Sequence, residues 1–406
     1  MAGFAQGRTT RSLMVNIAVL VGTTAFLPQV LFHAGWLGES PAVDPALMSK
    51  LLRGAAVALL LACSLPIDLS RSRLPSILAA AGVCAAALMF LLRPPSPNAL
   101  DVLFWNGAAV VVLSAALLAS DIPAAGVGRA GLELSVLLQA ALSLSLSVSG
   151  CWQSDNGGWV GATGNANTFA FLCLVVIGRH FFQPAVRWWH IPVIVVAALG
   201  VLESGSLFAV AWLAFLLCVG LIFRARIVVL STVLLVAFLL LAALGDGLLG
   251  EELGAGAISH VAFKFRSLFA WILGDADVVA SRSVGLRGLQ WREAIDWFVQ
   301  FPLALAVGGV GGGSYFAADS QVLTYVASFG VPVTMALLAP VALGIRRLGS
   351  AGPRFVEFGC QLLLVTVFLV VNRCYDYFSG GIVIALVLAE VSAPVPAGRR
   401  RMRSRP

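Results

Sequence analysis

Long apolar runs, separated by short polar or glycine- and proline-rich stretches, repeat along most of the chain. A helix needs about 20 predominantly apolar residues to cross roughly 30 Å of hydrocarbon, and several of these runs lie near the lower limit. The runs do not alternate polar and apolar residues, as the strands of a membrane β-barrel would. We therefore predict about twelve membrane-spanning helices. They are expected at Leu13–Phe32, Leu51–Ile67, Leu74–Leu92, Val102–Ala119, Leu132–Ser149, Ala166–Phe182, Arg187–Leu202, Leu207–Phe223, Ile227–Leu244, Gln321–Ile345, Phe355–Val371 and Phe378–Val391.

Composition narrows the class of protein further. Hydrophobic residues make up 60% of the 406 residues and charged residues only 11%, whereas a soluble chain carries about 25% charged residues. There are too few charges to cover a soluble core of this length. The composition excludes a soluble globular enzyme, a disordered chain and a secreted disulfide scaffold. The prediction is an all-α polytopic membrane protein, with residues 1–406 forming a single integral domain.

The positions of the basic residues predict the orientation in the membrane. If the N-terminus is cytoplasmic, most of the 26 basic residues fall in cytoplasmic segments and few in the short outer loops, as the positive-inside rule requires. Both termini are then cytoplasmic, and residues 394–406 form a basic tail. The tail is either a plain topology anchor or a contact for anionic membrane lipid. The net charge of +7 therefore does not call for nucleic acid.

One outer segment, residues 245–319, is too long for a simple connector, and loops of this length are usually functional. Within it Val284–Phe301 is expected to form an amphipathic helix, because Trp291, Ile295 and Phe298 follow helical spacing. Arg287 lies one turn before Trp291, at the edge of that stripe. A helix lying in the interface would hold Arg287 at the depth of a lipid-linked pyrophosphate. The alternative is a generic interfacial arginine.

The end of this loop carries glycines and an acidic residue. Val307–Ser314 is glycine-rich but lacks the Lys-Ser/Thr of a nucleotide-binding loop. Its glycines favour a tight re-entrant path or a close approach to substrate. Asp319 stands just before the tenth predicted span, where it is either an N-cap or a general base that deprotonates a sugar hydroxyl. The two roles are compatible.

Other polar groups are expected on the same outer face. Asn165 is placed to cap the sixth span, and Asn165 and Asn167 could bind sugar hydroxyls. Trp159 is either a stacking platform for a sugar or an interfacial residue. Glu203 stands in a very short connection at the membrane edge, which makes it a functional candidate. Arg373 and Asp376 flank the last outer turn, as a surface ion pair or as part of the same site. No Cys/His spacing resembles a metal site, and no cofactor is expected.

Together these outer-face motifs resemble the bacterial O-antigen ligase and polymerase family of membrane glycosyltransferases. The resemblance covers roughly Gly150–Leu343. It rests on Gly161–Asn167 before a span, on Glu203–Ser206 opening the next span but one, and on the segment from Arg287 to Gly311. Asp319-Ser320 and Ser328–Pro332 follow in the same order.

The resemblance implies a GT-C-like fold with a large periplasmic loop, in the bacterial inner membrane, with the active site facing the periplasm. It implies inverting, metal-independent transfer from a glycan on undecaprenyl pyrophosphate. Arg287 matches the family's large-loop arginine, with Arg282 beside it, and both would bind the pyrophosphate. Asp319, or failing it Glu203, would activate the acceptor hydroxyl. A chain-length-regulating co-polymerase and a flippase are the implied protein partners.

Two departures from the family pattern bear on the choice between polymerase and ligase. Leu207 stands where the family often has an arginine, so a second cation must come from elsewhere, such as Arg282 or Arg373. The ligases carry a histidine near the end of the large loop, where this chain has Asp319. The expectation is therefore a polymerase that joins lipid-linked repeat units, with an O-antigen ligase as the alternative. A transporter or flippase is a second alternative, although few ionisable residues lie within the spans.

Overall fold

The computed structural model describes residues 2–38, 43–64, 109–119, 128–149, 159–182, 187–223, 282–307, 319–349, 354–373 and 377–392, with isolated positions at 81–85, 88, 266–267, 269–270, 273 and 309. The helices are α1 (Ala2–Thr23), α2 (Leu27–His33), α3 (Pro45–Ser64), α6 (Ala109–Ala119), α7 (Arg129–Val148), η2 (Gly161–Thr163), α8 (Ala166–Phe181), α9 (His190–Glu203), α10 (Leu207–Phe223), α13 (Arg282–Gln300), α14 (Pro302–Val307), α15 (Gln321–Leu337), α16 (Ala339–Leu348), α17 (Phe355–Val371) and α18 (Phe378–Ser392).

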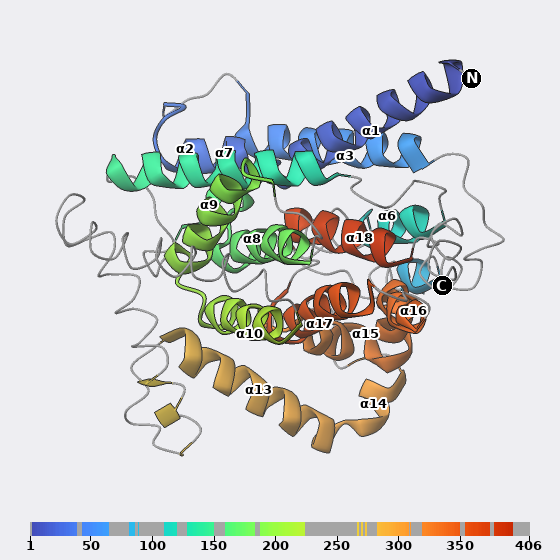
Figure 1. The fold of residues 1–406 in the computed structure, drawn as a ribbon. Helices are drawn as coiled ribbons and strands as arrows, with labels where there is room; N and C mark the ends of the chain where they lie inside the picture. Colours follow the sequence, from blue (N-terminus) through green and yellow to red (C-terminus); the bar gives the residue numbers. More distant parts are fainter. Residues whose placement is uncertain are drawn as a thin grey trace.

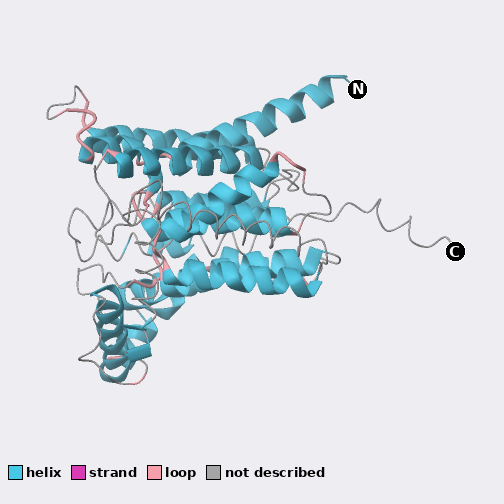
Figure 2. Ribbon diagram, turned by 60° about the vertical axis from the view of Figure 1, so that its left-hand side comes forward, coloured by secondary structure: helices cyan, strands magenta, loops and turns pink. Residues whose placement is uncertain are grey.

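The prediction of an all-helical fold is confirmed, since the described residues contain helices and no strand (Figure 2). Among the described residues, three helical segments are long and apolar enough to cross a membrane, or four if the bent pair α15–α16 counts as one span. The three are Thr10–His33, Pro45–Ser64 and Arg129–Val148. The total of twelve spans and the large outer loop stay predictions, because the spans expected at Leu74–Leu92 and Ile227–Leu244 and most of residues 245–281 lie outside the described residues.

The helices pack in tiers around α8 and α18 (Figure 1). The first tier contains α1, α3 and α7, the middle one α6, α8, α9 and α18, and the third α10, α15, α16 and α17, with α13 and α14 along its outer edge. Every residue of α8 from Thr168 to Phe181 is buried. A helix that is apolar on all sides is buried on all sides, and this one forms the centre of the core. Phe171 of α8 contacts Phe368 of α17, with ring centroids 4.6 Å apart.

Hydrogen bonds and ion pairs assign the helix ends to two ends of the bundle. The backbone N–H of Trp159, just before α8, donates to the carbonyl of Glu203 at the end of α9 (2.8 Å). The N–H of Gln321, which opens α15, donates to the carbonyl of Asn372 after α17 (3.1 Å). These contacts define the outer end, which carries Trp159, Asn165, Glu203, Asp319 and Arg373.

The opposite ends of the same helices meet at the inner end. The end of α8 and the start of α9 bring the rings of His180 and His190 to 4.5 Å between centroids. Arg179 at the end of α8 and Arg354 before α17 both pair with Glu390 near the end of α18, at 2.9 and 3.1 Å. The predicted topology places this end on the cytoplasmic side.

The span expected over Gln321–Ile345 is observed as two helices, α15 and α16, which together are long and apolar enough to form one bent span. α15 and α16 meet at an angle of 40°, and Gly330 within α15 has φ 79° and ψ 171°. Gly330 tolerates this conformation, and Pro332 cannot donate the usual helical hydrogen bond. The Thr334 hydroxyl donates to the Gly330 carbonyl, four residues earlier (2.8 Å).

Gly309, from the glycine-rich stretch, lies against the backbone of α15 just before Gly330. Gly309 has φ 76°, and a Cβ atom placed there would lie 2.7 Å from the backbone of Ala327 and Phe329. The neighbour of Gly309 is protein backbone, so the predicted close approach of these glycines to substrate stays a prediction.

Candidate functional site

Arg287 and Asp319, predicted separately as catalytic residues, lie together at the outer end. Nε of Arg287 on α13 donates to Oδ2 of Asp319 at 3.1 Å. The side chains are 33% and 42% exposed. Gln290, one turn further along α13, accepts from the backbone N–H of Asp319 (3.0 Å). One face of α13 therefore holds both the carboxylate and the backbone of the residue that precedes α15.

The helix cap at the start of α15 is provided by Ser320. Its hydroxyl accepts from the N–H of Leu323 (3.3 Å), which is the bond that was expected of Asp319 as an N-cap. That interpretation of Asp319 was wrong. Because Ser320 satisfies the helix start, the Asp319 carboxylate is directed toward Arg287 and toward solvent.

A backbone hydrogen bond places Arg373 at the end of the bundle that carries Asp319. It directly follows Asn372, whose carbonyl accepts from Gln321, two residues after Asp319. Arg373 is half-buried. A second cation is therefore positioned at the end of the bundle that holds the Arg287–Asp319 pair. Asp376 and the side chain of Arg282 lie outside the described part of the chain, so their roles stay predictions.

Glu203 ends α9 at the same end of the bundle but on other helices. It stands at the outer boundary of the predicted seventh span, in the turn that leads to α10. Burial raises the pKa of its carboxyl to about 7, because removal from water disfavours the charged form. In the described residues no hydrogen bond or ion pair joins the Glu203 side chain to Arg287 or Asp319. The sequence placed three candidates at one face, and two of them are in contact.

The three residues near the start of α8 that were predicted to bind sugar have different surroundings. Asn165 caps α8, because its Oδ1 accepts from the Thr168 N–H (3.0 Å), as predicted. Asn167 is half-buried. Trp159 is only 9% exposed and belongs to the hydrophobic core. Its ring face is covered in this conformation, so stacking on a sugar would require the segment around Trp159 to open.

The inner end carries a buried ionic network that sequence reasoning missed. Arg179 and Glu390 are 5% and 8% exposed, and Glu390 bridges Arg179 to Arg354, which also pairs with Glu357 (2.7 Å). No local sequence motif indicates this network, because its members come from three helices and Arg179 of α8 lies far in the sequence from α17 and α18. Their position in the turns or last residues of apolar runs is the one signal that the sequence offers.

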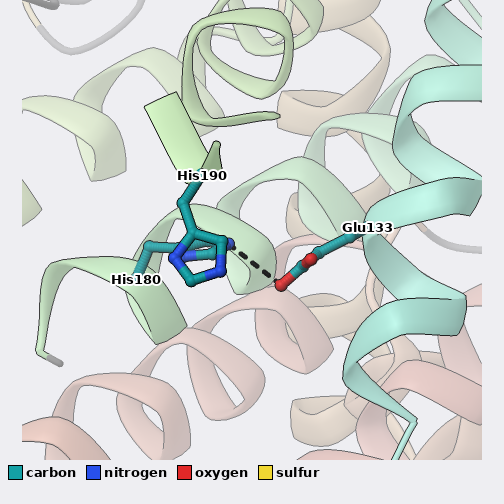
Figure 3. Close-up of side chains that lie close together, drawn as sticks. All are labelled: Glu133, His180 and His190. Atoms are coloured by element: carbon teal, nitrogen blue, oxygen red, sulfur yellow. Dashed lines mark ion pairs between the residues drawn. The ribbon is translucent and has the colours of Figure 1, made fainter. Parts of the chain in front are cut away.

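A second inner cluster holds three groups that can bind a metal ion: Glu133 of α7, His180 of α8 and His190 of α9. One donor atom from each lies within 4.8 Å of the others. Nε2 of His180 lies 3.1 Å from the Glu133 carboxylate, and the imidazoles of His180 and His190 lie against each other facing Glu133 (Figure 3). The spacing of these residues along the chain did not indicate a metal site, since the fold alone brings them together.

Comparison of the chain with protein-family models and with curated proteins gives no match.

Proposed function

We propose that this protein is a membrane polysaccharide polymerase, and the observation that carries the proposal is the contact between Arg287 and Asp319. The substrate is an oligosaccharide repeat unit on undecaprenyl pyrophosphate, and the product is a lengthened lipid-linked glycan. A pyrophosphate that leaves without metal requires fixed cations, and an acceptor hydroxyl requires a base. Arg287 supplies a cation and Asp319 supplies a base, and their Nε and Oδ2 atoms lie 3.1 Å apart.

The exposure of the pair suits a site that exchanges partners. An ion pair that is one third or more exposed contributes little to stability, so a pyrophosphate can replace Asp319 at the Arg287 guanidinium. Arginine binds phosphate oxygens in bidentate fashion. The exchange frees the Asp319 carboxylate at the moment when the donor is bound. Arg373 is the candidate for the second cation on the leaving group.

The reaction then proceeds as a single displacement. The acceptor hydroxyl oxygen attacks the anomeric carbon of the donor sugar, and Asp319 takes the hydroxyl proton. The bond between that carbon and the pyrophosphate oxygen breaks, and undecaprenyl pyrophosphate leaves on Arg287. Attack opposite to the leaving group inverts the anomeric configuration. In this scheme Asn167 and Glu203 are candidates for contacts to the sugar.

The test is an assay of the purified protein with a lipid-pyrophosphate-linked oligosaccharide. The native chain is expected to produce lipid-linked glycans longer by whole repeat units, and Arg287→Ala should lower the rate roughly 10²–10³-fold, the usual loss for removal of one group that stabilises developing charge. Arg292→Ala is the matched control, since Arg292 is an exposed arginine of the same helix. Native rates in Arg287→Ala would contradict the proposal.

Two further outcomes separate the alternatives. Transfer of the glycan to an added acceptor, without lengthening, would identify an O-antigen ligase. Cysteine-accessibility labelling that places residues beside Arg287 in the cytoplasm would exclude both reactions, because the predicted donor glycan faces the periplasm.

A further inference from the structure

The inner cluster of Glu133, His180 and His190 presents its donor atoms to one point, which a guanidinium group occupies. Nε of Arg129 donates to the Glu133 carboxylate. An NH2 group of the same guanidinium lies 2.9 Å from Nδ1 of His180 and 3.3 Å from Nε2 of His190. Nδ1 of His190 lies 3.5 Å from the same NH2 group. A guanidinium can only donate and a neutral imidazole has one acceptor nitrogen, so Nδ1 of His180 and one nitrogen of His190 act as acceptors. The three side chains form a cradle for a cation.

The hydrogen bonding within the cradle is incomplete. His180 is 1% exposed, and its Nε2 makes no well-directed hydrogen bond within the described part of the chain, although it lies 3.1 Å from Glu133. Buried polar atoms are nearly always hydrogen-bonded, so such an atom in a native fold requires an explanation. A ligand that draws donor atoms from all three side chains would supply one.

We propose that Glu133, His180 and His190 bind a divalent transition-metal ion, with Zn²⁺ as the best fit, and that the ion takes the place of the Arg129 guanidinium. Two imidazoles and one carboxylate are a common zinc ligand set that leaves a fourth position for water. Imidazole favours zinc over the hard cations magnesium and calcium. Guanidinium and metal ion exclude each other, since both are positive and both need the same lone pairs.

The position of Arg129 allows the exchange. It is the first residue of α7, it follows Gly128 with φ 72°, and its side chain is 24% exposed. The long arginine side chain can therefore leave the cradle toward solvent without a change in the helix. The site lies at the inner end of the bundle, opposite to Arg287 and Asp319, and it does not depend on the proposed polymerase activity.

The test is Zn²⁺ uptake by the purified full-length protein, prepared without a polyhistidine tag and stripped with a chelator. We expect about one Zn²⁺ per chain after gel filtration. Loss of a metal ligand should cost at least as much as loss of a supporting residue, so His190→Gln and His180→Gln should bind at least about tenfold more weakly. His33→Gln is the matched control, because His33 ends α2 outside the cluster, and it should bind as the native chain does.

Arg129→Gln tests the exchange itself. Removal of the competing guanidinium should tighten Zn²⁺ binding, and the d–d absorption of Co²⁺ bound in place of Zn²⁺ should intensify at lower metal concentration. Weaker binding in Arg129→Gln would overturn the exchange, since the guanidinium would then support the ion. Failure of the native chain to take up stoichiometric Zn²⁺ would overturn the proposal, as would uptake that neither histidine substitution alters.

Discussion

The two ends of this helical bundle carry their charges in opposite ways. At the inner end Arg179 and Glu390 are 5% and 8% exposed, and the carboxylate of Glu390 contacts two arginines. At the outer end Arg287 and Asp319 are 33% and 42% exposed and share a single contact. The charges of Arg179 and Glu390 are opposite and are covered by core helices, and only Arg354 of this network is substantially exposed, whereas both members of the outer pair are accessible from solution.

This difference indicates which charges can meet a ligand. Buried ion pairs contribute little net stability but become costly when one partner is removed, because the remaining charge has no water. Exposed pairs open and close at almost no cost. The outer end is therefore suited to an exchange of ionic partners during a reaction, and the ion pairs among Arg179, Arg354 and Glu390 are suited to holding α8, α17 and α18 together.

The largest effect is expected from breaking the inner network. Glu390→Gln removes the counter-charge of Arg179 while it keeps the shape of the side chain, and should destabilise the protein by roughly 3–5 kcal/mol, the usual cost of a stranded buried charge. The measurement is thermal or denaturant unfolding in detergent. The double variant Arg179→Met/Glu390→Gln should recover much of this loss. A loss of less than 1 kcal/mol in Glu390→Gln would remove the contrast between the two ends.

This network shows where sequence reasoning stops. Apolar runs predicted an all-helical fold because hydrophobicity is local and additive along the chain. The amphipathic pattern predicted the helix over Val284–Phe301, observed as Arg282–Gln300. Which charged residues form an ion pair depends on contacts between distant parts of the chain. Glu390 pairs with Arg179, 211 positions earlier in the sequence, and the residues around either one do not indicate this partner.

As with the fold, the sequence predicted part of the candidate site and missed the features that depend on contacts between distant residues. The sequence singled out Arg287 and Asp319, and the fold brings them into contact. It offered Asp319 as the cap of α15, whereas Ser320 provides the cap, because both side chains can accept from the helix start. It missed the break at Gly330, although Gly330 and Pro332 together weaken a helix. It also missed the cradle of Glu133, His180 and His190, which requires three helix ends to meet.

The next effect in size concerns the half-buried carboxyl of Glu203 at the outer end. The pKa of Glu203 is raised by burial to about 7 in the folded protein, so folding favours its protonated form. Stability from this group is complete at acid pH and is lost as pH rises through about 7. Glu203→Gln lacks this loss and should be more stable than the native chain above pH 7, by up to about 3 kcal/mol.

Thermal unfolding of the two proteins between pH 4.5 and pH 8 checks this expectation. The curves should coincide at the acid limit and separate as pH rises. A difference that is the same at every pH would show that Glu203 acts through packing rather than through its charge, and would weaken its candidacy as a titrating group of the site.

A smaller effect distinguishes the two asparagines at the outer end. Asn165→Ala removes the cap of α8 and should cost about 1 kcal/mol of stability. Asn167→Ala is the matched substitution, since Asn167 lies within the first turn of the helix and provides no cap, and it should change stability by less than about 0.5 kcal/mol. If Asn167 binds sugar, its variant raises KM in the polymerisation assay at unchanged stability. Equal destabilisation by both changes would contradict this division of roles.

The smallest expected effect on stability falls on the pair with the largest expected role in activity. A double-mutant cycle of Arg287→Ala and Asp319→Ala should give a coupling free energy of unfolding below about 1 kcal/mol, because both side chains are substantially exposed. Each single variant should nevertheless lose glycan lengthening. A coupling of about 3 kcal/mol or more would mean that the pair stabilises the fold, as the buried pair of Arg179 and Glu390 is expected to do. A pyrophosphate could not then displace Asp319 from Arg287 at low cost. Weak coupling with lost activity would mean that the contact holds the two groups ready for a ligand rather than holding the fold together.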